Sequence, residues 1–160
     1  MKQKAVFGAG CFWHVQHVFD SLEVDTQVGY MGGDEKKFPN PSYKDVCSGK
    51  TGYAEAVYIE YDKKVSYEKL LDLFWKSHDP TQYHRQGSDV GSQYRSVIFY
   101  FNDKQKNLAK KTKKEVEKKL GKKVYTEIVK AGKFVRAEEY HQKYYKKHPV
   151  YCKVINLFGK

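Results

Sequence analysis

The sequence predicts an α+β fold, and three observations lead to that prediction. Its 160 residues are enough for one ordinary domain with a sizeable core. Hydrophobic residues make up 40% and aromatic residues 16%, which favours a packed structure over intrinsic disorder. Short alternating segments also interleave with segments of helical spacing. We therefore expect residues 1–160 to form a single domain.

The first six elements follow one another in the order β-α-β-β-α-β. We expect strands at residues 5–8, 25–28, 54–61 and 96–101, where apolar or alternating runs are short. Residues 12–22 form the first expected helix, because Val15, Val18, Phe19 and Leu22 recur at helical spacing. Residues 66–77 form the second, with these residues facing inward: Leu70, Leu71, Phe74 and Trp75.

This order is typical of a split βαβ, or ferredoxin-like, core. Beyond it we expect a helix at 103–120, a strand near 125–129 and a last helix near 138–147. The two long connections, 29–52 and 78–95, are too long for simple turns, and such loops inside a domain are usually functional or mobile.

The expected topology brings three distant residues to one edge of the sheet. In a split βαβ unit the first two strands run one way and the other two run in the opposite direction. The end of the first strand therefore lies beside the starts of the third and fourth strands. Cys11, Glu55 and Tyr94 occupy these three positions, so we expect them to converge.

Cys11 follows Gly8-Ala9-Gly10 and opens the first helix. A helix N-terminus favours negative charge, so we expect the pKa of this thiol to be lowered and the thiolate to be available as a nucleophile. The alternative interpretation is a small buried cysteine at a strand–helix junction.

Glu55 lies, by strand alternation, on the same face as Val57, Ile59 and Tyr61. Burial there would raise the pKa of its carboxyl group and allow it to donate a proton. The alternative is an edge glutamate that leans into water. Several loop tyrosines could polarise an oxygen-bearing substrate at the same edge: Tyr30, Tyr43, Tyr53, Tyr83 and Tyr94.

Two other kinds of site have weaker support. Cys11, His14 and His17 share one helix, but no fourth ligand follows at zinc-like spacing, so we expect no metal. A cysteine protease would need a histidine base, and nothing singles out His14 or His84 for that role.

The net charge of +11 comes from 30 basic and 19 acidic residues, and residues 104–123 carry +8 of it. A basic face could bind nucleic acid through counterion release, so a nucleic-acid-binding module is the second function hypothesis. However, Leu108, Thr112, Val116 and Leu120 form one apolar stripe in this segment, so the lysines are expected to cover the solvent side of an amphipathic helix. Nucleic-acid binding is therefore disfavoured.

The sequence also predicts where the protein works. Three cysteines, Cys11, Cys47 and Cys152, are too few for a secreted disulfide scaffold. No apolar stretch is long enough to span a membrane, and the first residues have no apolar signal core. We expect a cytoplasmic protein with intracellular thiols.

Several ordered motifs carry a resemblance to a known family. They are GAGCFW at 8–13, GYMGG at 29–33, PNPSYKDVCSG at 39–49, TGYAEAV at 51–57, HDP at 78–80 and RQGSDVGSQYRS at 85–96. Together they cover most of the chain, which resembles the A-type peptide methionine sulfoxide reductases.

The resemblance implies a role for several residues of these motifs. Cys11 would attack the sulfoxide sulfur and Glu55 would protonate its oxygen, to which Tyr43 and Tyr94 would donate hydrogen bonds. The substrate-binding residues implied are Phe12 and Trp13, which would hold the S-methyl group, and Asp89.

The resemblance also implies a cofactor-free reduction of the S epimer of methionine sulfoxide, free or in peptides. Cys11 becomes a sulfenic acid, a second thiol condenses with it, and thioredoxin reduces the disulfide. We expect Cys152, in a C-terminal tail at 148–160, to be that resolving cysteine, with Cys47 as its rival. We expect a monomer.

Three residues depart from the pattern of the family. His14 and Gln16 stand where glycine and glutamate are usual, and Tyr53 replaces a common histidine. The C-terminal region also lacks the glycines that surround the resolving cysteine in many relatives. His14 lies one turn from Cys11, where it could tune the pKa of the thiol, although a surface histidine is the simpler expectation.

Overall fold

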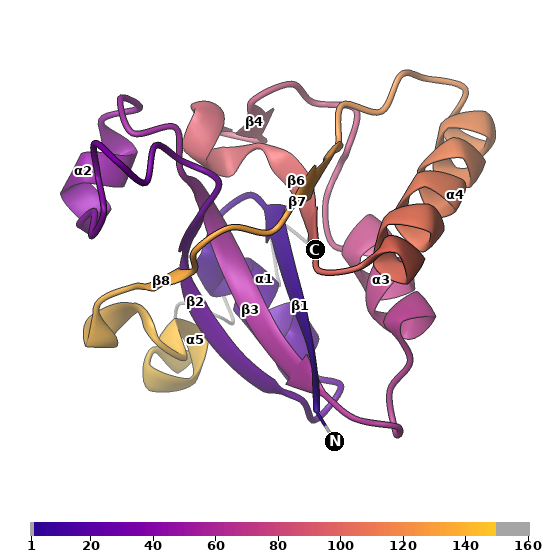
Figure 1. Cartoon of the computed structure of the whole chain (residues 1–160), viewed down its shortest axis with the longest axis horizontal. Coiled ribbons are helices and arrows are strands. Elements are labelled where there is room, and N and C mark those ends of the chain that lie inside the picture. The colour runs from indigo at the N-terminus through magenta and orange to yellow at the C-terminus, as the bar shows by residue number, and fades with distance from the viewer. Residues whose placement is uncertain (1, 150–160) are drawn as a thin grey trace.

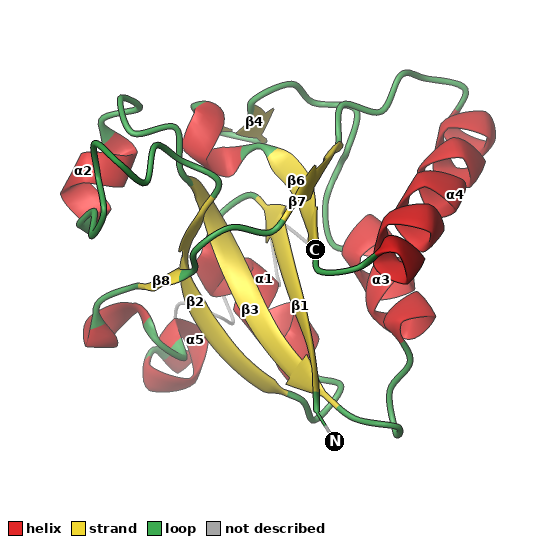
Figure 2. Ribbon diagram, in the orientation of Figure 1, coloured by secondary structure: helices red, strands yellow, loops and turns green. Residues whose placement is uncertain are grey.

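The computed structural model describes residues 2–149 and has a mixed α+β architecture, as predicted. One sheet of six strands runs through it in the order β7-β6-β1-β3-β2-β8 (Figures 1 and 2). The strands of this sheet are β1 (Gln3–Ala9), β2 (Asp25–Met31), β3 (Ala54–Tyr61), β6 (Ser96–Tyr100), β7 (Glu127–Lys130) and β8 (Val135–Arg136). A two-stranded hairpin is formed by β4 (Arg85–Gln86) and β5 (Asp89–Val90).

The helices differ in length and position. They are α1 (Phe12–Asp20), α2 (Tyr43–Cys47), α3 (Tyr67–Lys76), α4 (Asp103–Leu120) and α5 (Tyr144–Lys147), with short 3-10 helices η1 (Ser92–Tyr94) and η2 (Glu139–His141). In Figure 1, α3 and α4 lie beside each other at one end of the sheet, and α2 lies at the opposite end. None of the helices within residues 2–149 is both long and apolar enough to cross a bilayer.

Strands β1, β2, β3 and β6 pair only with antiparallel neighbours among themselves. Phe7 on β1 stacks against Phe19 on α1 and lies 5.0 Å, between ring centroids, from Phe74 on α3. These aromatic contacts place α1 and α3 on one face of the sheet, over the larger part of the core. The segment after β7 covers the opposite face, where Phe134 contacts Tyr58.

Helix α4 has the boundaries expected from its sequence because both ends are capped. Asn102 accepts a hydrogen bond from the Gln105 N–H at the start, and Gly121 ends the helix in the left-handed conformation. The helix connects β6 to β7, which are parallel and therefore need a crossover connection. Leu108 packs against the core as predicted, but Leu120 is 45% exposed.

The region after β7 differs from its prediction. The expected helix at 138–147 is divided into η2 and α5, because Gln142 and Lys143 between them leave the helical conformation. The side chain of Gln142 accepts from the Val28 N–H and donates to the Val28 carbonyl. Gln142 thus satisfies the backbone of β2 at the point where its pairing with β8 ends.

Several other boundaries were also wrong. Strand β2 continues to Met31 instead of ending at residue 28, because the whole stretch pairs with β3. The long loops contain α2 and the β4–β5 hairpin, which were not predicted. Residues 2–149 include only part of the tail expected at 148–160, and Cys152 lies outside the described residues.

Candidate active site

Cys11 lies in a tight turn between β1 and α1, where it is the N-cap residue of the helix. Gly10 precedes it with φ +97°, a conformation that side chains rarely adopt, and a Cβ atom there would meet the side chain of Gln86 at 3.0 Å. A Cβ atom on Gly8 would lie 2.7 Å from the side chain of Val97. The two glycines therefore allow the chain to turn against β6 and the β4–β5 hairpin.

Glu55 reaches this turn from the first part of β3. Its side chain is 1% exposed, and its Oε1 atom accepts a hydrogen bond of 3.1 Å from the backbone N–H of Phe12. Phe12 directly follows Cys11, so the carboxyl group and the thiol share the N-terminus of α1. The expected approach of Glu55 to the turn at Cys11 and the expected burial of Glu55 are both confirmed.

The carboxyl group of Glu55 holds its proton near neutral pH. Burial raises its pKa from the usual 4.5 to about 8, because a buried site disfavours the charged form. The hydrogen bond from Phe12 lowers the pKa, but by less than burial raises it, and Asp89 adds a further increase. A buried neutral carboxylic acid can donate a proton to a bound oxygen atom.

The prediction that Cys11 is a thiolate is wrong for the site without substrate. Burial, and to a smaller extent the neighbouring Glu55, raise the pKa of the thiol from its usual 9.0 to about 12. The N–H groups of Trp13 and His14 lower it, as a helix N-terminus should, but these effects are smaller. The position of Cys11 at a helix end predicts a lowered pKa, but the desolvation of the thiol in the folded protein outweighs this effect.

Two of the predicted tyrosines lie around Glu55. Tyr43 opens α2 and Tyr94 ends η1, and the pKa of each hydroxyl group is raised mainly by burial and then by neighbours that include Glu55. Both hydroxyl groups therefore keep their protons and can donate hydrogen bonds. Asp89, on the β4–β5 hairpin, raises the pKa values of Glu55, Cys11 and Tyr94, which places it at the same site.

The other predicted tyrosines have different surroundings. Tyr30 is buried on β2 and donates a hydrogen bond to Glu138. Tyr53 donates to the Phe38 carbonyl, and Tyr83 is exposed.

Phe12 and Trp13 form an aromatic wall next to Cys11. Phe12 is buried and its ring lies 5.8 Å from that of Tyr30 and 6.3 Å from that of Tyr43. Trp13 stacks flat on Tyr144 of α5, with ring centroids 3.7 Å apart. This wall could hold an apolar group such as a methyl substituent beside the thiol.

His141 and Glu138 are two site residues that sequence analysis missed. His141 is 1% exposed, accepts a hydrogen bond from the indole N–H of Trp13 and lies 4.4 Å, between ring centroids, from Tyr43. Glu138 accepts from the Tyr30 hydroxyl and from the Tyr43 N–H. Both residues lie in the segment that was expected to be a plain terminal helix, and only its cluster of histidine and tyrosines could have pointed to them.

Cys47 and Cys152 are the two candidates for the second thiol, and only Cys47 lies within the described residues. Cys47, at the end of α2, is exposed; its side chain is hydrogen bonded to Tyr43, and it also raises the pKa of Tyr94. It therefore borders the site.

Across residues 2–149, no group of three or more His, Cys, Asp or Glu side chains is arranged to hold a metal ion.

Comparison with known proteins identifies the family of the chain. Residues 3–158 match the model of the family described as peptide methionine sulfoxide reductase. The chain belongs to this family. A curated reductase of this name from Methanococcus maripaludis is 49% identical over 148 residues, which are 91% of this chain and 92% of the relative.

Solved structures of reductases from this family share the fold. Mxr1 from Saccharomyces cerevisiae in reduced form superposes with a TM-score of 0.88 at 38% identity, covering 92% of this chain and 86% of Mxr1. The same protein in complex with Trx2 gives a TM-score of 0.59 at 26% identity, over 89% of this chain and 84% of that chain. The chain is thus an oxidoreductase that reduces methionine sulfoxide, and this result decides against the nucleic-acid-binding module as its function.

The substitution Glu55→Gln should stabilise the reductase at high pH. The folded state holds a proton on Glu55 up to pH of about 8, whereas the unfolded chain releases it near 4.5. The stability that comes from a neutral Glu55 is therefore complete below pH 4.5 and is lost as the pH rises towards 8. At pH 9 we expect the variant to be more stable by roughly 2–4 kcal/mol.

Urea unfolding of both proteins between pH 5 and pH 9 measures this difference. Glu60→Gln, on the same strand but only half-buried, is the matched control and should not change the pH slope. Equal slopes in the wild type and Glu55→Gln would show that Glu55 is ionised in the folded site.

Proposed function

We propose that this reductase acts on the S epimer of methionine sulfoxide, with Cys11 as nucleophile and Glu55 as general acid. The observation that carries the proposal is the buried carboxyl group of Glu55, hydrogen bonded to the N–H of the residue after Cys11. An acid and a thiol on one side of the substrate can act on the same sulfoxide group. A fixed arrangement of acid, thiol and methyl pocket also distinguishes the two epimers.

The pKa values suggest the order of proton transfer. Glu55 donates its proton to the sulfoxide oxygen, which makes the sulfur electrophilic. The resulting carboxylate takes the proton of the Cys11 thiol as the Cys11 sulfur forms its bond to the electrophilic sulfur. The oxygen then passes to Cys11, methionine leaves, and Cys11 carries a sulfenic acid while Glu55 is protonated again.

The neighbouring residues fit the remaining roles. The protonated hydroxyl groups of Tyr43 and Tyr94 would hydrogen bond to the oxygen as its charge develops. Phe12 and Trp13 would bind the S-methyl group, and Asp89 on its hairpin would hold the substrate backbone. Each role is an inference from the position of the residue and from the family.

The scaffold of the site can be interpreted as a split βαβ unit. The strand order β6-β1-β3-β2 with antiparallel neighbours is the arrangement expected when β1-α1-β2 and β3-α3-β6 interlock. In such a unit, the end of β1 meets the starts of β3 and β6, which supports the placement of Cys11, Glu55 and Tyr94 around one substrate.

A second cysteine would then complete the cycle. Its thiol attacks the Cys11 sulfenic acid, water leaves, and a thioredoxin dithiol reduces the disulfide. The crystallised complex of the yeast relative with Trx2 supports thioredoxin as the reductant. Cys152 remains our first candidate for the resolving cysteine, and Cys47 is the alternative because it borders the site.

Cys11→Ser should abolish reduction of N-acetylmethionine S-sulfoxide, because the hydroxyl group of serine is a far weaker nucleophile than a thiol. The wild type should reduce the S epimer at least about a hundredfold faster than the R epimer. Chiral chromatography of the products measures both rates. Cys47→Ser is the matched control for the loss of one thiol, and it should retain single-turnover reduction. Turnover by Cys11→Ser would require a different nucleophile.

Glu55→Gln should slow the single-turnover reductive step by about 10²–10⁴-fold, the usual contribution of a general acid. In the wild type the rate of that step should fall as the pH rises past about 8, because Glu55 then loses its proton. Rapid-quench measurement of methionine formation tests both effects. An unchanged rate in Glu55→Gln would exclude Glu55 as the acid.

Cys152→Ser should still form one equivalent of methionine but should lose turnover driven by thioredoxin. Mass spectrometry after one equivalent of sulfoxide should show a disulfide between Cys11 and Cys152 in the wild type. Cys47→Ser should recycle normally. The opposite pair of phenotypes would assign the resolving role to Cys47.

A further inference from the structure

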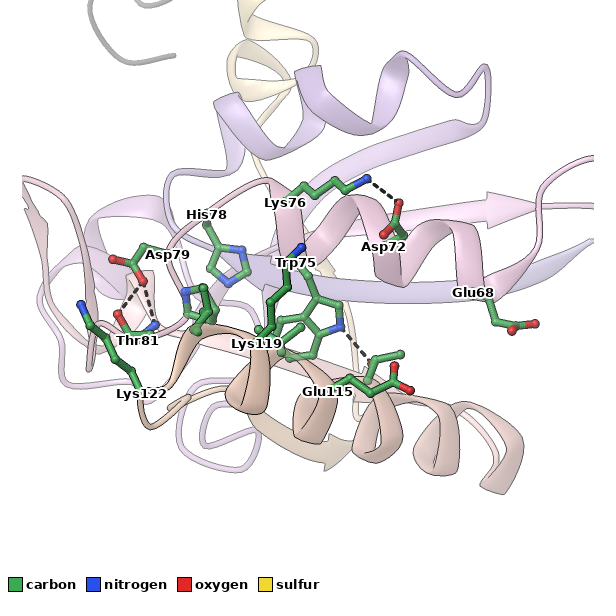
Figure 3. A pocket seen from close by; sticks show the side chains of 14 residues that line it. Glu68, Asp72, Trp75, Lys76, His78, Asp79, Thr81, Glu115, Lys119 and Lys122 are labelled. Carbon is green, nitrogen blue, oxygen red and sulfur yellow. Dashed lines mark hydrogen bonds and ion pairs between the residues drawn. The ribbon is translucent and has the colours of Figure 1, made fainter.

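A groove, shown in Figure 3, separates α3 from α4, and its lining does not include Cys11. It encloses about 710 Å³ and is lined by residues of both helices and of the loop at 78–81. The indole N–H of Trp75 donates to the hydroxyl group of Thr112, which joins the two helices across the groove. Apolar side chains of Trp75, Pro80, Val116 and Leu120 are among its lining residues.

Charges of both signs surround this apolar surface in nearly equal number. The carboxylates are Glu68, Asp72, Asp79 and Glu115, and the ammonium groups are Lys76, Lys119 and Lys122. Asp72 and Lys76 form an ion pair of 3.0 Å, and the pKa of Asp79 is lowered mainly by its hydrogen bond from Thr81 and to a smaller extent by Lys122. In Figure 3, Glu68 and Glu115 lie towards one end of the groove, and Lys122 and Asp79 lie towards the other.

This combination selects one kind of occupant. Because the carboxylates of the lining balance its ammonium groups, the groove offers no surplus of positive charge for the phosphates of a nucleic acid, despite the many lysines elsewhere on α4. An unfolded polypeptide offers what the groove can bind, namely apolar side chains flanked by both acidic and basic ones. If an apolar side chain of the bound polypeptide packs on Leu120 and Trp75, the charged residues next to it in that polypeptide can pair with the charged groups at either end of the groove.

The groove is also connected to the catalytic turn. The side chain of Gln86 accepts a hydrogen bond from the Asp79 N–H and donates one to the Asp79 carbonyl, each 2.9 Å long. The same side chain lies against Gly10, the residue before Cys11. A chain that leaves the site over the β4–β5 hairpin would therefore reach the loop at 78–81 and then the groove.

We propose that the α3–α4 groove is a secondary binding site for the polypeptide chain of an oxidised, unfolded protein substrate whose methionine sulfoxide occupies the site at Cys11. This proposal rests on the proposed function. Under this proposal, free methionine sulfoxide and short peptides use the catalytic site alone. Long unfolded substrates gain affinity from contacts with Leu120, Val116 and Trp75.

Leu120→Gln tests the proposal with two substrates, N-acetylmethionine sulfoxide and peroxide-oxidised β-casein. Leu120 is 45% exposed and glutamine suits a helix, so the variant should fold. We expect KM for oxidised casein to rise about five- to tenfold, the loss expected from one apolar side-chain contact, with kcat unchanged. The value of kcat/KM for N-acetylmethionine sulfoxide should stay within about twofold of the wild type.

Val129→Gln is the matched control, because Val129 is a similarly exposed apolar residue, at 38%, on β7 and outside the groove. It should leave both substrates unaffected. Val116→Gln provides a second groove variant and should behave like Leu120→Gln. Equal effects on both substrates, no effect of either groove variant, or a casein defect in Val129→Gln would overturn the proposal. A wild type that fails to reduce N-acetylmethionine sulfoxide would instead contradict the proposed function.

Discussion

The site depends on the burial of one carboxyl group at the start of one helix. Glu55 enters from β3 and its Oε1 atom accepts the N–H of Phe12, so the first turn of α1 is held against the sheet by the acid itself. Removing this carboxyl group from water is what keeps it protonated near neutral pH. The same burial also keeps Cys11 protonated. The fold therefore places two groups that hold their protons at the N-terminus of one helix, a fully buried carboxyl group and a partly exposed thiol.

Aromatic residues from distant parts of the chain close this site. Phe12 and Trp13 come from α1, Tyr43 from α2, and His141 from η2. Glu138, directly before η2, links this segment to β2 and α2, because it accepts hydrogen bonds from Tyr30 and from Tyr43. The arrangement of the site is thus a property of tertiary packing, and a local change in the last segment would reach the aromatic wall of Phe12 and Trp13 through His141.

Much of this could be predicted from sequence because the relevant signals are local. Strand alternation placed Glu55 on the apolar face, the glycines before Cys11 indicated a sharp turn, and an apolar stripe at helical spacing indicated α4. The motifs led to the correct family. The protonation state of Cys11 could not be predicted, because it depends on how much water several distant elements exclude. His141 was missed because its segment was expected to be a plain terminal helix, whereas its place beside Trp13 and Tyr43 is set by tertiary packing. The cytoplasmic location, the monomeric state and the single domain stay predictions.

Gln142 shows how the fold protects a strand that the short β8 leaves incompletely paired. Its side-chain amide accepts from the Val28 N–H and donates to the Val28 carbonyl, the same two bonds that a neighbouring strand would make. The side chain of Gln142 thus takes the place of a backbone peptide group and satisfies polar groups of β2 that could otherwise pair with a strand of another molecule. The Val28 carbonyl also accepts from the Ala137 N–H, so the segment after β8 satisfies this part of β2 with one side chain and one backbone group and leaves fewer free groups with which another chain could pair.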